Sequence, residues 1–416
     1  MNITNTNKSV VIIGGGYGGI RAMQKLSLSS NISITLIDRN PYHYLQTEAY
    51  ALIANTATLT DVTVDLVALC KTYPNVTYIK SNVDAINLEA KTVVYTGKTL
   101  AYDNLIMACG SHTKFPKAIL GLQDYAHGVK TLHRAFKFKQ QFEQELYERM
   151  QSEDDHFCKA FNVVIGGAGL SGVEVAAEMG HFAKKFMRDN RMMCEGIKIY
   201  LIASRDTLLD NMHPYLQKKA QTRLKRLGVE VLYKTRIVEV KATEVLLSRG
   251  SVIAFDFMIF AGGVEASSLT KSLGCPLNTK GQIQVEKTLQ IQCHKNVYAI
   301  GDAAALEDAQ GVSIPATANA AEKSAEIAVK NILLQLQGQR PQHAFIKLEG
   351  ILVALGGRSA AVVLFDVFKV SGYLGYLLKK LITWHYKYLL DKEAFKAYKA
   401  MKRDEREQRL AAKKQT

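Results

Sequence analysis

Two patterns of apolar and polar residues alternate along the chain and predict strands that are followed by helices. Short runs of β-branched and aliphatic residues, 10–13, 32–38, 105–108 and 163–165, are typical of strands buried on both faces. Charged stretches with a helical pattern lie at 135–150 and in the segment 313–336, which has Pro315 near its start. The alternation favours an α/β fold built on parallel sheets.

Two of the apolar runs end in the same glycine spacing. The pattern G-x-G-x-x-G occurs at Gly14, Gly16 and Gly19 and again at Gly167, Gly169 and Gly172. A strand that ends in a tight glycine turn lets the backbone approach a pyrophosphate, whose charge then lies at a helix N-terminus. One such match is weak, but two predict two dinucleotides, a bound flavin and a diffusible nicotinamide.

Asp38 strengthens the first of these sites. It ends the apolar run 32–38, 24 residues after Gly14, where a carboxylate can bind a ribose hydroxyl. A later apolar run ends in Gly301 and Asp302 and repeats the strand-to-glycine pattern. We therefore expect two Rossmann-like domains, the second inserted in the first. The flavin-binding domain would comprise 1–155 and 276–340, the inserted nicotinamide-binding domain 156–275, and a C-terminal region 341–416.

Composition excludes several classes of protein. The 416 residues are 48% hydrophobic and 22% charged, which allows two ordinary domains and gives no sign of disorder. The N-terminus does not resemble a secretory signal, and no apolar run is long enough to span a bilayer. The six cysteines form no C-x-x-C and have no zinc spacing, so we expect reduced thiols in a cytoplasmic protein and no metal. A redox disulfide between distant cysteines stays open.

The positive charge is concentrated at the C-terminal end. The chain carries +15, and residues 341–416 hold 15 Lys and Arg against 7 Asp and Glu. Within 371–390, one broad helical face carries Leu374, Leu377, Leu378, Leu381, Trp384, His385 and Tyr388, with Lys379, Lys380 and Lys387 as flanking cations. This pattern is typical of a helix lying in an anionic membrane interface. Packing on the body or in a homodimer seam stays open as the alternative.

Several segments resemble known flavoproteins. The two loops, ACGS at 108–111, FAGG at 260–263 and AIGD at 299–302 resemble the two-dinucleotide-binding-domain flavoproteins. Within that superfamily, residues 40–61, the segment YDNLIMACGSHTKFPKAILGL and the following KTLHRA resemble type II NADH:quinone oxidoreductases. The resemblance covers essentially the whole chain.

The resemblance implies roles for individual residues. The first glycine loop would hold the pyrophosphate of FAD, Asp38 its ribose, and Gly301 with Asp302 its ribityl–phosphate side. The turn from Ala108 to Gly110 would pass close to the flavin. The second loop would hold NADH or NADPH, and Gly262 and Gly263 would leave room beside the nicotinamide. Glu174 would lie near both rings and is the single catalytic candidate, although a surface ion pair is its alternative reading.

Two departures from the family pattern leave questions open. Ala203 stands where a carboxylate would bind the 2′-hydroxyl of NAD, and Ser204 and Arg205 follow, so NADPH use is a live hypothesis. The family typically has A-Q-x-A-x-Q near the quinone, where this chain has Ala316, Asn319 and Lys323. Quinone remains the expected acceptor, with these three residues as candidates for its site.

The sequence therefore predicts a peripheral flavoenzyme, on the cytoplasmic side of the inner or plasma membrane, that transfers electrons from NAD(P)H to quinone. Sulfide:quinone oxidoreductase is a close rival, but it needs cysteines beside the flavin and usually has a degraded second loop. A soluble reductase of an iron–sulfur protein is a further rival. A redox-sensing nucleic-acid-binding flavoprotein is suggested by the charge alone, and no nucleic acid is expected because no binding module is recognisable.

Overall fold

Two sheets organise the molecule, which is described here as a computed structural model covering residues 7–151, 161–190, 196–292 and 294–415. All their strands pair in parallel except β20, an antiparallel edge strand of the first sheet. The first sheet has the order β20-β21-β9-β1-β2-β5 and the second the order β13-β12-β11-β17. The first sheet contains β1 (Lys8–Ile13), β2 (Ile32–Asp38), β5 (Val76–Lys80), β9 (Asn104–Met107), β20 (Gln290–Ile291) and β21 (His294–Ala299). The second contains β11 (Phe161–Gly166), β12 (Ile197–Ile202), β13 (Glu230–Leu232) and β17 (Phe257–Phe260).

Strand order explains how the chain returns to its first sheet. β1 pairs in parallel with β2 and β9, and β9 pairs in parallel with β21. Thus β21, nearly 200 residues after β9 in sequence, completes the sheet that β1 begins. The second sheet is built wholly from residues between 161 and 260.

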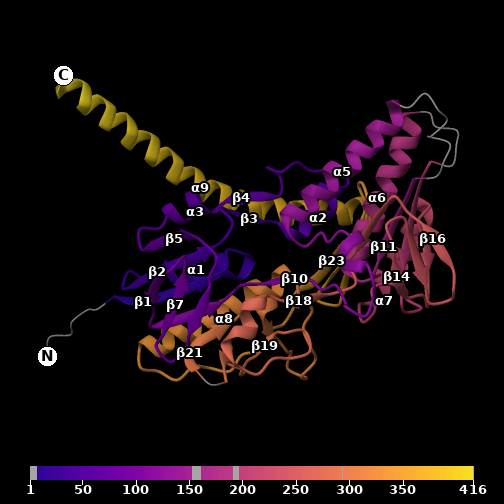
Figure 1. Ribbon diagram of the computed structural model, residues 1–416. Coiled ribbons are helices and arrows are strands. Elements are labelled where there is room, and N and C mark those ends of the chain that lie inside the picture. The colour runs from indigo at the N-terminus through magenta and orange to yellow at the C-terminus, as the bar shows by residue number, and fades with distance from the viewer. Residues whose placement is uncertain (1–6, 152–160, 191–195, 293, 416) are drawn as a thin grey trace.

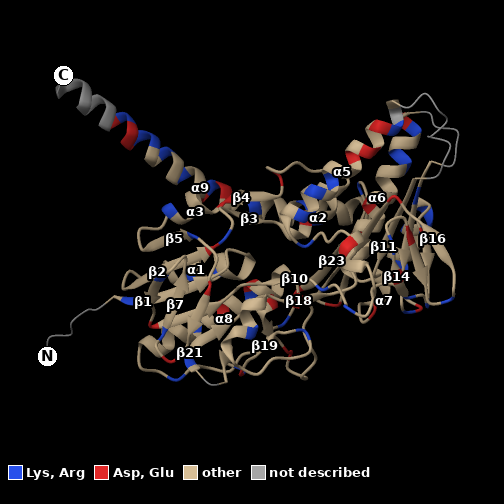
Figure 2. Cartoon of the chain, in the orientation of Figure 1, with Lys and Arg blue, Asp and Glu red and all other residues tan. Residues whose placement is uncertain are grey.

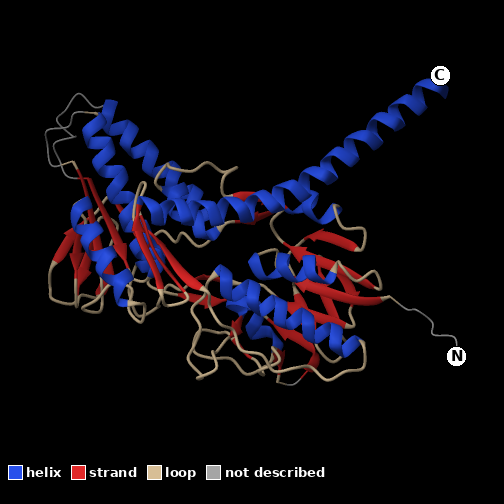
Figure 3. Ribbon diagram, turned by 180° about the vertical axis from the view of Figure 1, so that it is seen from behind, coloured by secondary structure: helices blue, strands red, loops and turns tan. Residues whose placement is uncertain are grey.

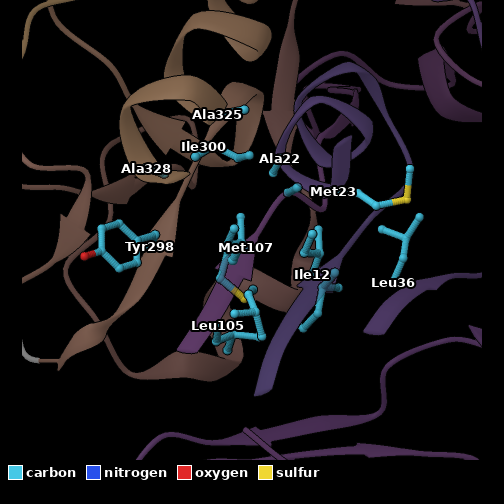
Figure 4. Packing of buried hydrophobic residues seen from close by; sticks show 14 of the residues in the cluster. Ile12, Ala22, Met23, Leu36, Leu105, Met107, Tyr298, Ile300, Ala325 and Ala328 are labelled. Atoms are coloured by element: carbon cyan, nitrogen blue, oxygen red, sulfur yellow. The ribbon is translucent and has the colours of Figure 1, made fainter. Parts of the chain in front are cut away.

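Helices cover both sheets. On the first sheet lie α1 (Tyr17–Leu26) and α8 (Ala318–Leu336), and beside the second lie α6 (Leu170–Asp189) and α7 (Pro214–Leu227) (Figure 1). The buried residues between β1, β9, β21, α1 and α8 interdigitate as one core, in which Ile12, Met107 and Ile300 are almost wholly buried (Figure 4). Their apolar packing fixes where the ends of these strands lie.

The helix predicted after Pro315 begins slightly later than the proline. α8 starts at Ala318 because Thr317 caps it, its hydroxyl accepting from the backbone N–H of Ala320 at 3.2 Å. A threonine cap satisfies an otherwise unpaired first-turn N–H, so the helix is set by the cap and not by the proline.

Smaller elements surround the two sheets. A two-stranded ladder joins β10 (Ser111–Thr113) to β18 (Val264–Ala266). Three further small sheets are β3 (Tyr42–Tyr44) with β4 (Thr63–Asp65), β6 (Ala85–Asn87) with β7 (Thr92–Tyr95) and β8 (Lys98–Ala101), and β14 (Ile237–Val240) with β15 (Glu244–Leu247) and β16 (Val252–Ala254). Short strands β19 (Ile283–Gln284) and β22 (Ala304–Ala305) pair near α8. The remaining helices before the C-terminal region are α2 (Ala49–Ile53), α3 (Leu66–Lys71), α4 (Leu122–Tyr125) and α5 (Leu132–Gln151).

The C-terminal region ends in one long helix. The antiparallel strands β23 (Gly350–Ala354), β24 (Ala360–Leu364) and β25 (Phe368–Gly372) lead directly into α9 (Tyr373–Gln415). This helix crosses above both halves of the molecule and then extends away from the body (Figures 1 and 3). Lys and Arg recur along it and along α5, which rises on the same side (Figure 2).

Candidate functional site

The first glycine loop is shaped by close backbone contacts. Gly14 has φ +110°, and a Cβ on it would lie 2.3 Å from the carbonyl oxygen of Ala108. A Cβ on Gly19 would lie 1.8 Å from the carbonyl oxygen of Gly14. A Cβ on Gly16, in contrast, would meet no atom of the described chain within 4 Å. The first and third glycines are therefore required by packing, while the second faces the open space that a pyrophosphate needs.

Asp38 lies directly against this loop. Its Oδ2 accepts from the backbone N–H of Gly15 at 2.6 Å, and its Oδ1 accepts from that of Asn40 at 2.7 Å. Burial raises the pKa of Asp38, and the two N–H groups oppose that rise. The structure thus brings the predicted ribose ligand to the glycine loop.

Asp302 lies at the end of β21, across the sheet from Asp38. It follows Gly301, whose φ of +59° suits glycine, and its Oδ2 accepts from the hydroxyl of Ser111 at 2.5 Å and from Nζ of Lys130 at 2.9 Å. Burial raises the pKa of Asp302, but the Lys130 charge together with the hydrogen bonds from Ser111 and Lys130 outweighs it and holds the pKa below its ordinary value. Lys130 was missed as a site residue, although it opens the KTLHRA segment.

The turn after β9 combines a buried and an open position. Ala108 is buried, and its carbonyl oxygen packs on Gly14. Gly110 has φ +66° and open space where a Cβ would stand. The open space at Gly110 is compatible with a cofactor beside this turn, as the sequence predicts.

The three quinone-site candidates lie at the start of α8 in different surroundings. Ala316 is exposed. Asn319 has a buried Oδ1 that accepts from no group of the described chain. Lys323 forms an ion pair with Glu349, Nζ to Oε1 2.8 Å, which raises its pKa. Asn319 therefore offers a free buried acceptor, whereas the Lys323 cation is already engaged.

The second glycine loop repeats the geometry of the first. Gly167 has φ +108°, and its Cβ would lie 2.6 Å from Cα of Gly262, while a Cβ on Gly172 would lie 1.7 Å from the carbonyl oxygen of Gly167. Gly169 again faces open space, as does Gly263. Gly262 has a packing role that the sequence reading did not anticipate, because a Cβ on it would also meet the ring of Phe260.

Glu174 is buried and not a surface partner. It is 8% exposed, and its Oε1 accepts from the backbone N–H of Ala354 at 3.0 Å. One turn later, Glu178 accepts from the hydroxyl of Thr56 at 3.2 Å and from the N–H of Gly357 at 3.1 Å. Burial raises the pKa of each carboxyl to about 7. A pair of carboxyls near neutrality can hold or release a proton.

Lys379 corrects one expectation from the sequence. It was expected to flank the apolar face of the C-terminal helix as a surface cation, but it is 8% exposed and points into the body. Its Nζ donates to Oε1 of Glu48 at 2.9 Å and to the hydroxyl of Tyr50 at 2.6 Å. It also acts electrostatically on Glu174, where it opposes the rise in pKa. A buried cation needs such partners, so the inner face of α9 brings charge to the site.

The segment after β12 carries exposed cations. Ala203 is buried, and Arg205, which follows Ser204, is exposed, with Nε 3.7 Å from Asp210. The backbone N–H of Lys234 donates to the carbonyl oxygen of Arg205 at 2.9 Å, which brings a second cation to this end of the strand. Lys234 was not identified from the sequence, because it lies 29 positions away and only the pairing of β12 with β13 brings it near.

The outer face of α9 exposes its large apolar side chains. Leu374, Leu377, Leu381, Trp384 and Tyr388 are between 43% and 65% exposed, and the rings of Trp384 and Tyr388 stack at 5.1 Å. The inner face is different, since Leu390 and Ala394 belong to the buried core. Within the described part of the chain, no helix is long and apolar enough to cross a membrane.

Of the six cysteines, Cys158, Cys194 and Cys293 lie outside the described residues. Cys70 and Cys109 are free thiols, and the sulfur of Cys275 lies 3.7 Å from the carbonyl oxygen of Leu273. Burial raises the pKa of Cys109, in the turn after β9, to about 11, so its thiol stays protonated.

The chain is similar to several known proteins over most of its length. The family described as pyridine nucleotide-disulphide oxidoreductase matches residues 8–325. An NADH dehydrogenase-like protein of Bacillus subtilis is 26% identical over 92% of this chain and 99% of its own length. A type II NADH:quinone oxidoreductase of Mycobacterium tuberculosis is 26% identical over 92% of this chain and 84% of its own. The solved structure of NDH2 from Plasmodium falciparum in complex with NADH has the same fold, with a TM-score of 0.83 at 17% identity over 95% of this chain and 98% of its own.

Proposed function

The chain belongs to the pyridine nucleotide-disulphide oxidoreductase family, and from this premise we propose that it is a flavin-dependent NAD(P)H:quinone oxidoreductase. The relatives named NADH:quinone oxidoreductases align along almost the whole chain, which supports this activity. The single observation that carries the proposal is the pair of glycine loops, each with packed first and third glycines and an open second one. Two such loops fit two dinucleotides.

We propose FAD for the first loop, because the surrounding residues fit that cofactor. The open space at Gly16 fits its pyrophosphate, and Asp38 offers a carboxylate for its ribose. Ala108 and Gly110 follow β9, and Asp302 follows β21, so all three lie at strand ends near the first loop. When bound, the flavin supplies the two-electron chemistry between reduced nicotinamide and quinone. We divide the chain accordingly into an FAD-binding part, 1–155 and 276–340, and an inserted part, 156–275, a division that the sheet membership of β21 supports.

The second loop would hold the nicotinamide dinucleotide. The N-terminus of α6 and the open space at Gly169 suit a pyrophosphate, and Gly263 leaves space nearby. Ala203, directly after β12, carries no carboxylate, and Arg205 stands two residues later as an exposed cation paired with Asp210 at 3.7 Å. An exposed arginine at this place supports NADPH as a substrate alongside NADH. Ser204 would add a hydroxyl to a phosphate site of this kind.

The protein's own groups would orient the quinone and hold a proton. Asn319 offers a buried acceptor at the start of α8, beside Ala316 and Lys323, where the quinone would bind. Glu174 has a pKa of about 7 and so can be protonated or ionised at physiological pH. As a residue expected beside the nicotinamide and the flavin, it would hold or release a proton there, with Lys379 stabilising its carboxylate form.

The outer face of α9 would lie in an anionic membrane surface. Leu377, Leu381 and Trp384 expose apolar area on one side of a helix that carries much of the chain's basic excess. A quinone dissolved in the bilayer would then reach the site from the same side. This arrangement supports a peripheral enzyme, which we propose lies on the cytoplasmic side of the inner or plasma membrane. A seam between two copies could cover the same face, and a measured monomer mass would argue against it.

Sulfide:quinone oxidoreductase is the second candidate, since it shares the expected acceptor. It needs thiols beside the flavin that hold polysulfide, but Cys109 is the only described cysteine in the turn after β9, and its thiol is protonated. The intact second loop also favours a nicotinamide substrate over sulfide.

One anaerobic experiment tests the proposed function. Purified protein with its bound flavin is mixed with NADH or NADPH, and then with a menaquinone or ubiquinone analogue. We expect stoichiometric bleaching of the flavin absorbance by the nicotinamide and its recovery on quinone addition. Bleaching by sulfide but not by either nicotinamide would refute the proposal and favour the rival. Protein that neither contains nor binds flavin would refute both.

A further inference from the structure

The C-terminal helix contacts the first glycine loop through side chains that the proposed chemistry does not use. The hydroxyl of Tyr386, on α9, lies 3.2 Å from Nε2 of His43, on β3. Nδ1 of the same ring lies 3.1 Å from the carbonyl oxygen of Gly15. A carbonyl can only accept, so Nδ1 must carry the proton and donate, which leaves Nε2 to accept from Tyr386. The two contacts form one directed chain from α9 to the loop.

This chain of hydrogen bonds is enclosed. His43 is 1% exposed, and its burial lowers its pKa to about 4, so the ring is neutral at physiological pH. Tyr17, the first residue of α1, packs edge-on against His43 with centroids 4.7 Å apart and lies 5.2 Å from the Tyr386 ring. The hydroxyl of Tyr17 is in turn bonded to Oγ1 of Thr47 at 2.9 Å. Tyr386 therefore packs on Tyr17, directly after Gly16, and reaches Gly15, directly before it, through the ring of His43.

The Gly15 peptide groups are held from two directions. The N–H of Gly15 donates to Asp38, and its carbonyl oxygen accepts from His43. These contacts fix the orientation of the peptides on either side of Gly15, and hence the direction in which the loop presents its N–H groups. Anion binding by a glycine loop depends on that direction.

We propose that Tyr386 and His43 are positioning residues for the first glycine loop, so that the seating of the C-terminal helix on the body sets how tightly the protein holds its flavin dinucleotide. This inference rests on the proposed function, which assigns the flavin to that loop. α9 presents Trp384 and Tyr388 outward and Tyr386 inward, so one helix would contact the membrane with one face and the cofactor loop with the other.

Two single-atom changes two residues apart test the inference. Tyr386→Phe removes only the inward hydroxyl, and Tyr388→Phe removes an exposed one as the matched control. The dissociation constant of FAD is measured by titrating flavin-depleted protein, following flavin fluorescence. We expect Tyr386→Phe to raise it by about three- to tenfold, the effect of one lost buried hydrogen bond, and Tyr388→Phe to leave it unchanged. His43→Gln, which keeps a donor and an acceptor, should fall between wild type and Tyr386→Phe.

Two further readouts separate positioning from general stability. The visible circular dichroism of the bound flavin should change in Tyr386→Phe and not in Tyr388→Phe, and the melting temperature of the flavin-depleted Tyr386→Phe protein should fall by no more than one lost buried hydrogen bond explains. An unchanged FAD dissociation constant in Tyr386→Phe, or a change equal to that of Tyr388→Phe, would overturn the inference. If wild type binds FAD and is bleached by NADH or NADPH in that case, the proposed function stands and only the positioning role fails.

Discussion

Replacing Glu174 by glutamine should change how the stability of the protein depends on pH. Burial raises the pKa of this carboxyl from an ordinary 4.5 to about 7. Each unit of difference between the two pKa values corresponds to about 1.4 kcal/mol. Ionising this carboxyl therefore costs the folded state about 3 kcal/mol more than it costs the unfolded state. Glutamine stays neutral and keeps an oxygen that can accept from the N–H of Ala354.

The sign of the effect follows from proton binding. Because the folded-state pKa lies above the unfolded one, the folded state holds the proton more tightly. The stabilising contribution of protonated Glu174 is complete below about pH 4.5 and is lost as pH rises through 7. Wild type should therefore lose about 3 kcal/mol over this range from this group, and Glu174→Gln should not.

Urea unfolding of the flavin-saturated protein between pH 5 and 8.5 measures the difference. The two free energies of unfolding should nearly agree at pH 5, and the variant should be the more stable by about 3 kcal/mol at pH 8.5. Glu230→Gln, an exposed control, should give a curve parallel to wild type. Parallel curves for Glu174→Gln, or lower stability than wild type at pH 8.5, would refute the reasoning.

Four further outcomes follow from the structure. Gly169→Ala places a methyl group in open space, so the KM for the nicotinamide should rise by about tenfold or more in steady-state assays with little change in melting temperature. Arg205→Glu should lower the ratio of kcat/KM for NADPH to that for NADH by about tenfold, and an unchanged ratio would argue against a phosphate site there. Leu377→Ser with Trp384→Ser should weaken binding to anionic vesicles by about a hundredfold in flotation assays, whereas equal binding would exclude the outer face of α9 as the anchor. Lys379→Met should reduce the free energy of unfolding by about 3–5 kcal/mol in urea titration, because it leaves a carboxylate without its buried cation, and unchanged stability would mean that the pair is solvated.

The sequence by itself determined the local features of this protein. The glycine spacing, the acid at Asp38 and the apolar runs depend on neighbours a few residues away, and they located both glycine loops and the strands that carry them. The exposed apolar face of α9 also followed from helical periodicity, because spacing alone decides which residues share a face.

Only the tertiary structure decided which side chains meet across the fold. Periodicity gave Lys379 a place on the helix but not its partner, and the packing of α9 on the body turned it inward onto Glu48. The raised pKa of Glu174 likewise depends on burial beneath a backbone segment 180 residues later in the chain. Charge, burial and hydrogen bonding between distant segments are set by how the elements pack, and a linear pattern carries no record of that packing.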